Sequence, residues 1–203
     1  MSGADHGRRL MVEQLRARKI RDERVLDAMA AVRREDFFEG ADPYADAARA
    51  IGEGQTISQP YVVALMLEAL SLRPSDRLLE VGAGSGYAAA VASELVARVD
   101  AIERIGTLAD RARKRLEGRR HVHVHHTDGS EGWPQAAPYD AILVSAAGAR
   151  VPPALLEQLA DGGRLVMPVG PAAVQQLTLV TRDGDKLREQ GLGGVRFVPL
   201  ISG

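Results

Sequence analysis

Gly82, Gly84 and Gly86 stand between an apolar stretch over residues 78–81 and a run of small residues over 88–92. This pattern is typical of a strand, a tight turn and a helix, in which glycines allow strained backbone angles and a close ligand. Free N–H groups of the turn and of the first helical residues can then bind that ligand. The stretch predicts a site for a nucleotide-like molecule, with an ordinary strand–helix turn as the alternative.

The residues around the glycines narrow the chemistry of the ligand. A dinucleotide-binding turn reads G-x-G-x-x-G, and its third glycine packs the helix against the strand. Here Tyr87 stands at that position, so the pattern is G-x-G-x-G. Glu80 comes two residues before the first glycine and would repel a pyrophosphate. The turn therefore favours a ligand that carries a cationic amino-acid group.

Two further acids follow expected strands. Residues 99–103 read as a strand that ends in Glu103, 17 residues after Gly86. At about this distance an acid reaches the hydroxyl pair of a ribose, although a solvated glutamate at a strand end gives the same pattern. Asp128 and Gly129 follow the next strand and are a second candidate ligand contact.

Four of the five histidines lie over residues 121–126. His121, His123 and His125 alternate with valines, so they share one face of a strand. Side chains along one strand stand too far apart for a tetrahedral metal site, and no carboxylate cluster follows them. A half-exposed edge strand explains the alternation, and we expect no metal.

A second polar stretch, over residues 49–60, precedes an apolar helix over 61–70. Pro60 suits the first turn of that helix, where an N–H has no intrahelical partner. Ser58 and Gln59 would then lie at the helix N-terminus, where free N–H groups and the helix dipole favour an anion. Ser58 would equally serve as an ordinary helix cap, and the residue types alone favour neither role.

The N-terminal part is expected to form a helical packing layer. Residues 1–7 read as disordered, and a helix over 8–19 carries Leu10, Met11 and Leu15 at helical spacing. Asp22 is a candidate N-cap for a second helix. The apolar stripe of that helix consists of Val25, Leu26, Met29 and Val32.

Strand and helix patterns alternate towards the C-terminus. Residues 139–145 read as a central strand buried on both faces. Pro152 opens a helix that Asp161-Gly162-Gly163 would end, before a strand over 164–169. Strands over 176–182 and 196–201 flank a turn and predict an antiparallel end to the sheet. We therefore expect an open α/β sheet with ligands at the carboxyl ends of its strands.

Composition limits the class of protein. The 203 residues, 45% of them hydrophobic, suffice for one core and predict a single domain. The net charge of −1 lacks the basic excess of a nucleic-acid-binding protein. The absence of cysteine excludes disulfides, thiol catalysis and zinc–thiolate sites. The chain has no apolar run of membrane-spanning length and no signal peptide, which predicts a cytoplasmic protein.

Six motifs, in this order, closely resemble those of the protein-L-isoaspartate (D-aspartate) O-methyltransferases. They are G-Q-T-I-S-Q-P-Y (54–61), E-V-G-A-G-S-G-Y (80–87), D-G-S-E-G-W (128–133), P-Y-D-A-I-L-V (138–144), G-G-R-L-V-M-P-V-G (162–170) and V-R-F-V-P-L (195–200). The first and last are the most specific to the family, and the resemblance runs from about Met11 to Ile201. It implies a Rossmann-like class I methyltransferase fold: a seven-stranded, mostly parallel sheet with an antiparallel last strand, helices on both faces and an N-terminal helical layer. One domain would span 1–203, with helices and acceptor loop over 1–74 and the core over 75–203.

The resemblance also implies an activity. The enzyme would transfer a methyl group from S-adenosyl-L-methionine to L-isoaspartyl carboxylates in damaged peptides and proteins, leaving S-adenosyl-L-homocysteine. D-aspartyl residues would be a further acceptor, no metal, nucleic acid or membrane would be involved, and the chain would act as a monomer. Carried over by position, the donor site comprises Glu80, Gly82, Gly84, Ser85, Gly86, Glu103, Arg104, Asp128 and Gly129. Ser58 matches the active-site serine, and the acceptor site adds Gln55, Thr56, Ile57, Val144, Ala146 and Ala147.

Three segments depart from the family pattern. Residues 48–52 read A-R-A-I-G where the family usually has P-L-P-I-G, and Glu53 follows. T-D-G replaces G-D-G at 127–129, and Gly148-Ala149 stands where the loop usually has a proline. The first and third departures bear on acceptor recognition.

The chemistry of a carboxylate acceptor suggests the role of the serine. A side-chain carboxyl has a pKa of about 4, so it is ionised at cellular pH and needs no general base. The remaining task is to hold donor and acceptor in line. We therefore expect Ser58 and neighbouring N–H groups to orient the acceptor, without a covalent intermediate.

Other functions remain as alternatives. Amino-directed nucleic-acid methyltransferases have an Asn/Asp-Pro-Pro-aromatic motif where this chain has Ser145-Ala146-Ala147-Gly148, and carbon-directed ones need a cysteine. Tyr87 disfavours a dehydrogenase. A methyltransferase of the same fold acting on another carboxylate or a small molecule, and a non-catalytic donor-binding module, stay open.

Overall fold

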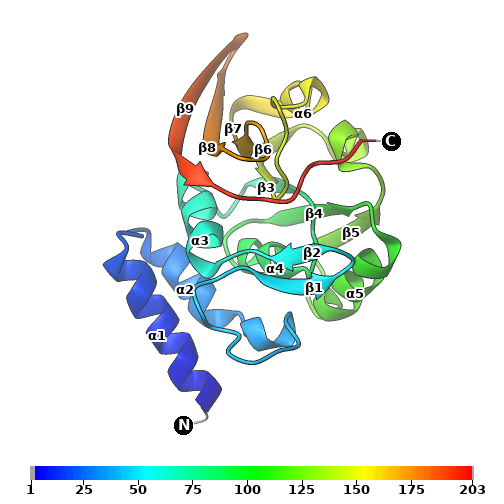
Figure 1. The fold of residues 1–203 in the computed structure, drawn as a ribbon. Helices are drawn as coiled ribbons and strands as arrows, with labels where there is room; N and C mark the ends of the chain where they lie inside the picture. The colour runs from blue at the N-terminus through cyan, green and yellow to red at the C-terminus, as the bar shows by residue number, and fades with distance from the viewer. Residues whose placement is uncertain (1–2, 203) are drawn as a thin grey trace.

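A seven-stranded sheet forms the centre of the protein in its computed structural model, which describes residues 3–202 (Figure 1). Neighbouring strands from β5 to β7 run parallel, whereas β8 runs antiparallel to both β7 and β9. The mostly parallel sheet with an antiparallel end is confirmed. In spatial order the strands are β5 (Val122–His126), β4 (Arg98–Glu103), β3 (Arg77–Val81), β6 (Tyr139–Val144), β7 (Leu159–Val169), β8 (Gln175–Asp183) and β9 (Lys186–Val195).

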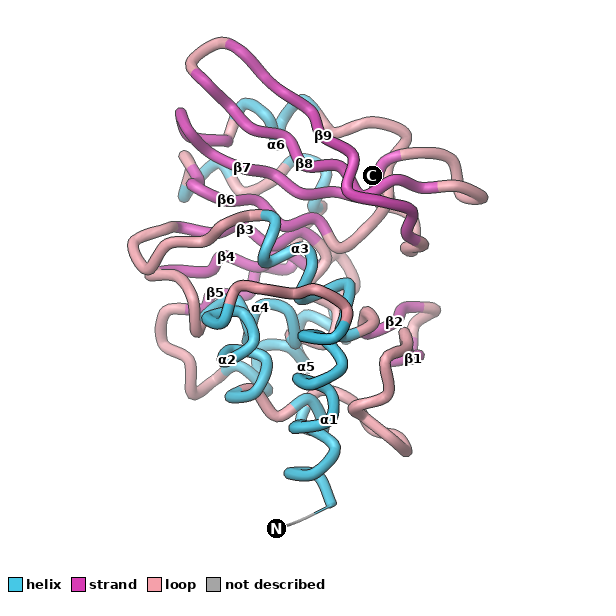
Figure 2. The backbone as a smooth tube through the Cα atoms, turned by 90° about the vertical axis from the view of Figure 1, so that its left-hand side faces the viewer, coloured by secondary structure: helices cyan, strands magenta, loops and turns pink. Residues whose placement is uncertain are grey.

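Helices cover both faces of this sheet (Figure 2). Because side chains alternate along a strand, Leu78 packs into the core of one face and Leu79 into the core of the other. The 3₁₀ turns are η1 (Arg34–Asp36), η2 (Gly129–Glu131) and η3 (Pro134–Ala136). The first face carries α1 (Gly3–Ala17), α2 (Glu23–Ala31), α3 (Pro60–Ala69), α4 (Tyr87–Ser93) and α5 (Gly106–Leu116), and the second carries α6 (Pro153–Glu157).

The strand order reverses beside β3. β4 and β5 lie on one side of β3, whereas β6 and the later strands lie on the other. Parallel α/β sheets bind ligands at the carboxyl ends of the strands next to such a reversal. The glycine turn after β3 therefore lies where this fold class places its ligand.

The N-terminal layer differs in detail from the expectation. α1 begins at Gly3, so the expected disorder over residues 1–7 is wrong for 3–7, and residues 1–2 lie outside the described part. An ion pair of 2.8 Å between Asp5 and Arg8 supports the first turn. Leu10 is 42% exposed and does not belong to the buried stripe, unlike Met11 and Leu15. The predicted N-cap of α2 is confirmed, because the Asp22 side chain accepts the Arg24 N–H at 3.0 Å.

A small hairpin precedes α3 and was not predicted. β1 (Arg49–Gly52) pairs antiparallel with β2 (Gln55–Ile57). Gly52, Glu53 and Gly54 in its turn all have positive φ, at 90°, 54° and 68°. Two of these positions need glycine because L side chains rarely adopt such angles.

Two boundaries near the C-terminus were wrong. Gly162-Gly163 does not end a helix, because α6 already ends at Glu157 and the glycines lie within β7. The pairing with β6 is irregular there, between Tyr139 and Ala141, and Gly162 takes a φ of 70° in that irregular stretch. The last strand is β9, not residues 196–201. That segment leaves the regular sheet, and its one β-type pairing is an isolated parallel bridge from Pro199 to Ala147.

The histidine-rich strand is an edge strand, as predicted, because β5 has a neighbour on one side only. The Nε2–H of His125 donates to the buried carboxylate of Asp100 at 2.9 Å, and the His125 ring stacks on Trp133 with ring centroids 4.0 Å apart. Among residues 3–202, no helix is long and apolar enough to cross a membrane.

Candidate active site

The glycine turn joins β3 to α4. Gly82, Gly84 and Gly86 all have positive φ, at 88°, 53° and 88°. Gly86 is the N-cap of α4, and a Cβ there would come within 3.1 Å of Leu116. The N–H groups of Gly82 and Ala83 both donate to the carbonyl of Ile102 at 2.9 Å. The turn is thus fixed to the neighbouring strand β4.

Glu103, at the end of β4, is bonded to the same turn. Its Oε2 accepts the N–H of Gly84 at 2.8 Å, and its Oε1 accepts the N–H of Ile105 at 2.9 Å. The side chain is buried. Hydrogen bonds from two main-chain donors hold the carboxylate at the rim of the turn.

Glu80 lies beneath the turn and is fully buried. Its Oε2 has no hydrogen-bond partner among the described residues. Burial, and then the negative charge of Glu103, hold the pKa of Glu80 well above its ordinary value. A buried carboxyl oxygen without a partner is costly. A positively charged ligand beside it would satisfy the oxygen and favour its ionised form.

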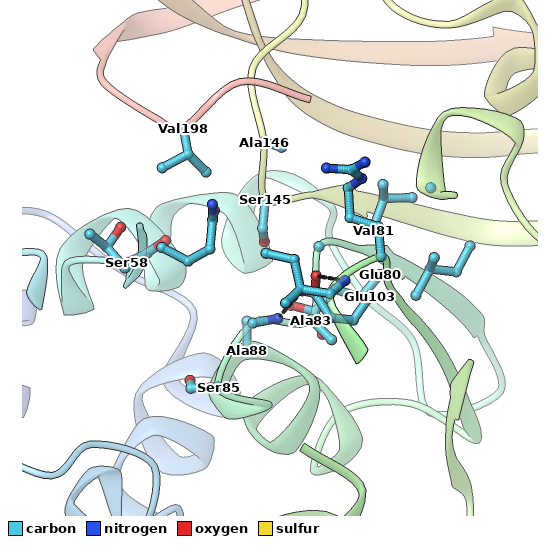
Figure 3. Close-up of a pocket in the computed structure, with 18 of the residues that line it drawn as sticks. Ser58, Glu80, Val81, Ala83, Ser85, Ala88, Glu103, Ser145, Ala146 and Val198 are labelled. Atoms are coloured by element: carbon cyan, nitrogen blue, oxygen red, sulfur yellow. Dashed lines mark hydrogen bonds between the residues drawn. The ribbon is translucent and has the colours of Figure 1, made fainter. Parts of the chain in front are cut away.

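One cavity brings the two predicted halves of the site together. Figure 3 shows Ser58 on one side of this cavity, Glu80 and Glu103 on the other, and Ser145 between them. The sequence-predicted residues that line it are Gln55, Thr56, Ile57, Ser58, Glu80, Gly82, Gly84, Ser85, Glu103, Arg104, Gly129 and Ala146.

Four predicted residues lie just outside the lining. Gly86 caps α4, and the Asp128 side chain accepts the N–H of Ser130 at 2.8 Å at the start of η2. Val144 is buried at the end of β6. Ala147 uses its main chain to hold the segment that follows β9. These four residues therefore lie behind or beside the residues that line the cavity.

Ser58 does not cap helix α3. The N-cap is Gln59, which makes no side-chain capping bond. Instead Asp46 accepts the N–H of Tyr61 at 3.0 Å and the side chain of Gln59 at 2.8 Å. The capping role left open for Ser58 is therefore filled by Asp46, and the Ser58 side chain lines the cavity.

A second cavity adjoins the Ser58 end of the first. Both are lined by Thr56, Ser58, Ser145 and Val198. Its walls are the outer face of α3, with Tyr61, Val62 and Leu65, and residues 192–198 at the end of β9 and beyond. Two arginines, Arg18 and Arg196, also line it. This open groove leads from Ser58 to the surface.

The sequence did not predict that the chain after β9 covers the first cavity. Val198, Pro199, Leu200 and Ile201 line it. The Ala147 N–H donates to the carbonyl of Val198 at 2.8 Å, and the Leu200 N–H donates to the carbonyl of Ala147 at 2.7 Å. A proline has no N–H for a strand ladder, so Pro199 was the one local sign that this segment is no regular strand.

The arrangement suits transfer between a cation and an anion. Glu80, Glu103 and the glycine turn fit a cationic ligand with ribose hydroxyls, and Ser58 faces them across the cavity. None of the described residues that line the two cavities is a histidine, so Ser58 has no imidazole base for nucleophilic attack. Residues 3–202 contain no group of three or more His, Asp or Glu that could hold a metal ion.

Comparisons with known proteins agree with this geometry. Residues 6–203 match the family model of protein-L-isoaspartate(D-aspartate) O-methyltransferase. A protein-L-isoaspartate O-methyltransferase of Methylorubrum populi is 56% identical over 96% of this chain and 94% of its own length. One from Roseiflexus sp. is also 56% identical, over 97% of this chain and 92% of its own. The crystal structure of a Plasmodium falciparum protein assigned to the same activity, in complex with S-adenosyl-L-homocysteine, has a TM-score of 0.85 at 26% identity. The match covers 96% of this chain and 98% of that one.

Proposed function

The chain belongs to the protein-L-isoaspartate(D-aspartate) O-methyltransferase family, and from this membership we infer how its residues divide the work. It is a repair enzyme that transfers a methyl group from S-adenosyl-L-methionine to isoaspartyl carboxylates in damaged proteins. S-adenosyl-L-methionine supplies the methyl group on a positively charged sulfur. The residue roles below are our proposal.

On the donor side, we assign the ribose hydroxyls to Glu103 and the positively charged part of the donor to Glu80. The unpartnered Oε2 of Glu80 supports this assignment, because a cation there would offset the cost of burying the carboxyl. The positive φ of Gly82 and Gly84 lets the main chain lie against the ligand. Asp128 and Gly129, at the start of η2, are assigned to the adenine end.

On the acceptor side, the Ser58 hydroxyl donates a hydrogen bond to the acceptor carboxylate. The carboxylate is already ionised near neutral pH, so the protein needs to orient it and exclude water rather than remove a proton. Hairpin β1–β2 and the segment over 198–201 close the cavity around this point. The polypeptide on either side of the isoaspartyl residue lies in the adjoining groove, which opens to solvent beside α3.

The observation that carries this assignment is the single cavity lined by both Ser58 and Glu103. The test is calorimetry with S-adenosyl-L-methionine, followed by methyl transfer to an isoaspartyl peptide and to its normal aspartyl twin. We expect donor binding and transfer to the isoaspartyl peptide alone. Donor binding with equal or no transfer to either peptide would contradict the proposal.

We further propose one methyltransferase domain over 1–203 that acts as a monomer in the cytoplasm, on proteins rather than on nucleic acids or membranes. The net charge of −1 supports a protein acceptor, because a nucleic-acid-binding surface needs a basic excess. D-aspartyl residues are a second acceptor in this proposal. Size-exclusion chromatography and a D-aspartyl peptide test these two points.

A further inference from the structure

Arg34 is a buried arginine that reaches the acceptor side of the site from the N-terminal layer. It begins the 3₁₀ turn η1 and is 1% exposed. Its Nε donates to the carbonyl of Pro43 at 2.8 Å, and its Nη2 donates to the carbonyl of Ser58 at 2.8 Å. The guanidinium carbon lies 4.7 Å from the ring centroid of Tyr87. One side chain thus contacts both Ser58 and the first residue of α4.

Burying this cation is costly, and its contacts offset the cost only in part. Both hydrogen bonds go to main-chain carbonyls rather than to a carboxylate. Nη1 is buried without a partner among the described residues. Burial lowers the pKa of Arg34, while Tyr87, Asp46 and Tyr44 oppose that shift. A buried charge that lacks a paired carboxylate contributes little to stability. Stability therefore does not explain why Arg34 contacts Ser58.

Arg34 holds the main-chain carbonyl of Ser58, the residue whose hydroxyl is proposed to bind the acceptor. Ser58 precedes the N-cap Gln59, and no side chain of the N-cap holds this end of α3. Asp46 restrains the helix side through Tyr61 and Gln59, whereas Arg34 restrains the carbonyl of Ser58 itself. The positive charge also lies within hydrogen-bond distance of the Ser58 carbonyl, and a cation close to Ser58 favours an anion bound at that residue.

We propose that Arg34 is a positioning residue for methyl transfer, which fixes Ser58 and supplies a buried positive charge behind the acceptor carboxylate. The proposal rests on the proposed function of Ser58. Arg34 touches neither reacting group, so it acts through the Ser58 main chain, which it holds, and through its charge. Nothing in the family motifs of the sequence pointed to Arg34.

A second arginine provides a matched control. Arg164 also donates to main-chain carbonyls, from Nε to Leu70 at 2.8 Å and from Nη2 to Ser71 at 3.2 Å. It is largely buried, is paired with Asp76, and lines neither cavity. Removing it should cost stability without moving Ser58.

The experiment compares Arg34→Met and Arg164→Met with the unchanged enzyme, using a soluble isoaspartyl peptide and S-adenosyl-L-methionine. The assay temperature is well below the midpoint of thermal unfolding of each protein. We expect Arg34→Met to raise the acceptor KM and lower kcat, with kcat/KM reduced roughly 10- to 100-fold by misplacement of the serine. The donor Kd should change less than about threefold, because the ring of Tyr87 stays packed against Phe37. Arg164→Met should keep the acceptor KM and kcat of the unchanged enzyme when activity is normalised to the fraction of protein that binds donor.

A merely structural role for Arg34 predicts a different result. Both variants would then lose active protein in proportion to stability, with the acceptor KM unchanged, and that outcome overturns the proposal. If the unchanged enzyme binds donor but does not methylate the peptide, the proposed function fails by itself. Hydrogen–deuterium exchange then decides the role of Arg34. Faster exchange over residues 55–63 in Arg34→Met but not in Arg164→Met supports it, and equal exchange overturns it.

A conservative variant keeps the test open should Arg34→Met fail to fold. Arg34→Lys retains the charge but has a single donor group that cannot bridge the carbonyls of Pro43 and Ser58 in the fork geometry of arginine. We expect an intermediate acceptor KM with exchange over residues 55–63 still accelerated. An acceptor KM equal to that of the unchanged enzyme would contradict the need for a bidentate contact and overturn the proposal.

Discussion

Ser58 lines both cavities, and none of the described residues that line them is a histidine. A serine in such surroundings can donate a hydrogen bond but is poorly suited to attack. We predict that Ser58→Ala leaves the donor Kd nearly unchanged and lowers kcat/KM for an isoaspartyl peptide. A hydrogen bond to a charged group contributes about 1.5–3 kcal/mol, which corresponds to a roughly 10- to 100-fold loss. Calorimetry and steady-state kinetics measure the two effects.

Two results would contradict this role for Ser58. One is a methyl- or acyl-serine adduct found by mass spectrometry during turnover, which would make Ser58 a nucleophile. The other is loss of donor binding in Ser58→Ala, which would place the serine on the donor side. Ser85→Ala is a useful comparison on that side, because the Ser85 hydroxyl accepts the N–H of Tyr87 at 3.3 Å at the start of α4.

Glu80 makes the stability of the ligand-free protein depend on pH. Its pKa is raised in the folded state, chiefly by burial and then by Glu103. The unfolded chain therefore loses this proton first, and stability falls as pH rises from roughly 4, the unfolded pKa, through the raised folded value. We predict that Glu80→Gln is more stable than the unchanged protein at neutral pH, and that this difference shrinks towards pH 4. The difference is about 1.4 kcal/mol for each unit by which the pKa is raised.

Urea unfolding of both proteins at several pH values measures the Glu80 effect, and donor titration adds an independent check. Glu80→Gln should weaken donor binding, because the amide cannot supply the negative charge that a cation favours. A stability difference that is the same at acid and neutral pH would show that the pKa of Glu80 is not raised in the folded protein. That result would remove our reason for placing the donor's positive charge beside it.

At the scale of elements, hairpin β1–β2 covers the glycine turn. Glu53 at its tip accepts the hydroxyl of Thr107 at 3.1 Å, and Arg111 of α5 donates to the carbonyl of Ile51 at 3.4 Å. Ile51 lies beside Gly84, 3.5 Å from where a Cβ of that glycine would stand. The hairpin is therefore anchored over the donor end by α5, through two exposed bonds.

We predict that Glu53→Ala speeds dissociation of S-adenosyl-L-homocysteine. An exposed hydrogen bond contributes about 0.5–1.5 kcal/mol, so the rate should rise roughly 2- to 10-fold. Stopped-flow displacement measures the rate. Glu53→Gln is the control, since its amide oxygen still accepts the Thr107 hydroxyl. Equal rates for all three proteins would mean that the hairpin does not limit release.

Elements with a local signal could be predicted from the sequence. β3, β4 and β6 are short apolar runs at the sheet centre, and the glycines after β3 announce the turn. Hairpin β1–β2 has only four and three residues, too few for a periodic pattern. The segment after β9 has strand-like composition but is held by Ala147 and by the side chain of Gln175. Neither partner is near it in sequence.

The residues of the candidate site also fall into those with a local sequence signal and those without one. Glu80, Glu103 and the glycines follow strands directly, so their types and spacing predict where they lie. Arg34 and Asp46 act on the Ser58 loop from 24 and 13–15 residues away, through contacts that no spacing rule describes. Their type gave no signal either, because arginine and aspartate in a polar stretch are usually solvent-exposed.

At the scale of the whole molecule, both ends of the chain contribute to one cavity. The sheet supplies the floor through β3, β4 and the residues that follow β6, while the part before α3 and the part after β9 supply opposite sides (Figure 1). The segment over 198–201 is held there mainly by two main-chain hydrogen bonds to Ala147. It contributes little to the two hydrophobic cores, where only Leu200 of this segment packs at an edge. The segment should therefore contribute more to the free energy of ligand binding than to the free energy of folding.

We predict that a chain ending at Val198 folds but binds S-adenosyl-L-methionine at least about tenfold more weakly. It loses Pro199, Leu200 and Ile201 from the cavity wall, and burial of one such side chain against a ligand contributes about 1.5 kcal/mol or more. A chain ending at Ile201 is the control, because it is also shortened but keeps every lining residue. Calorimetry gives the two affinities and thermal unfolding the two stabilities. Equal donor affinity in both would show that the segment is a passive surface, and a collapse of stability in the shorter chain would show that it belongs to the core.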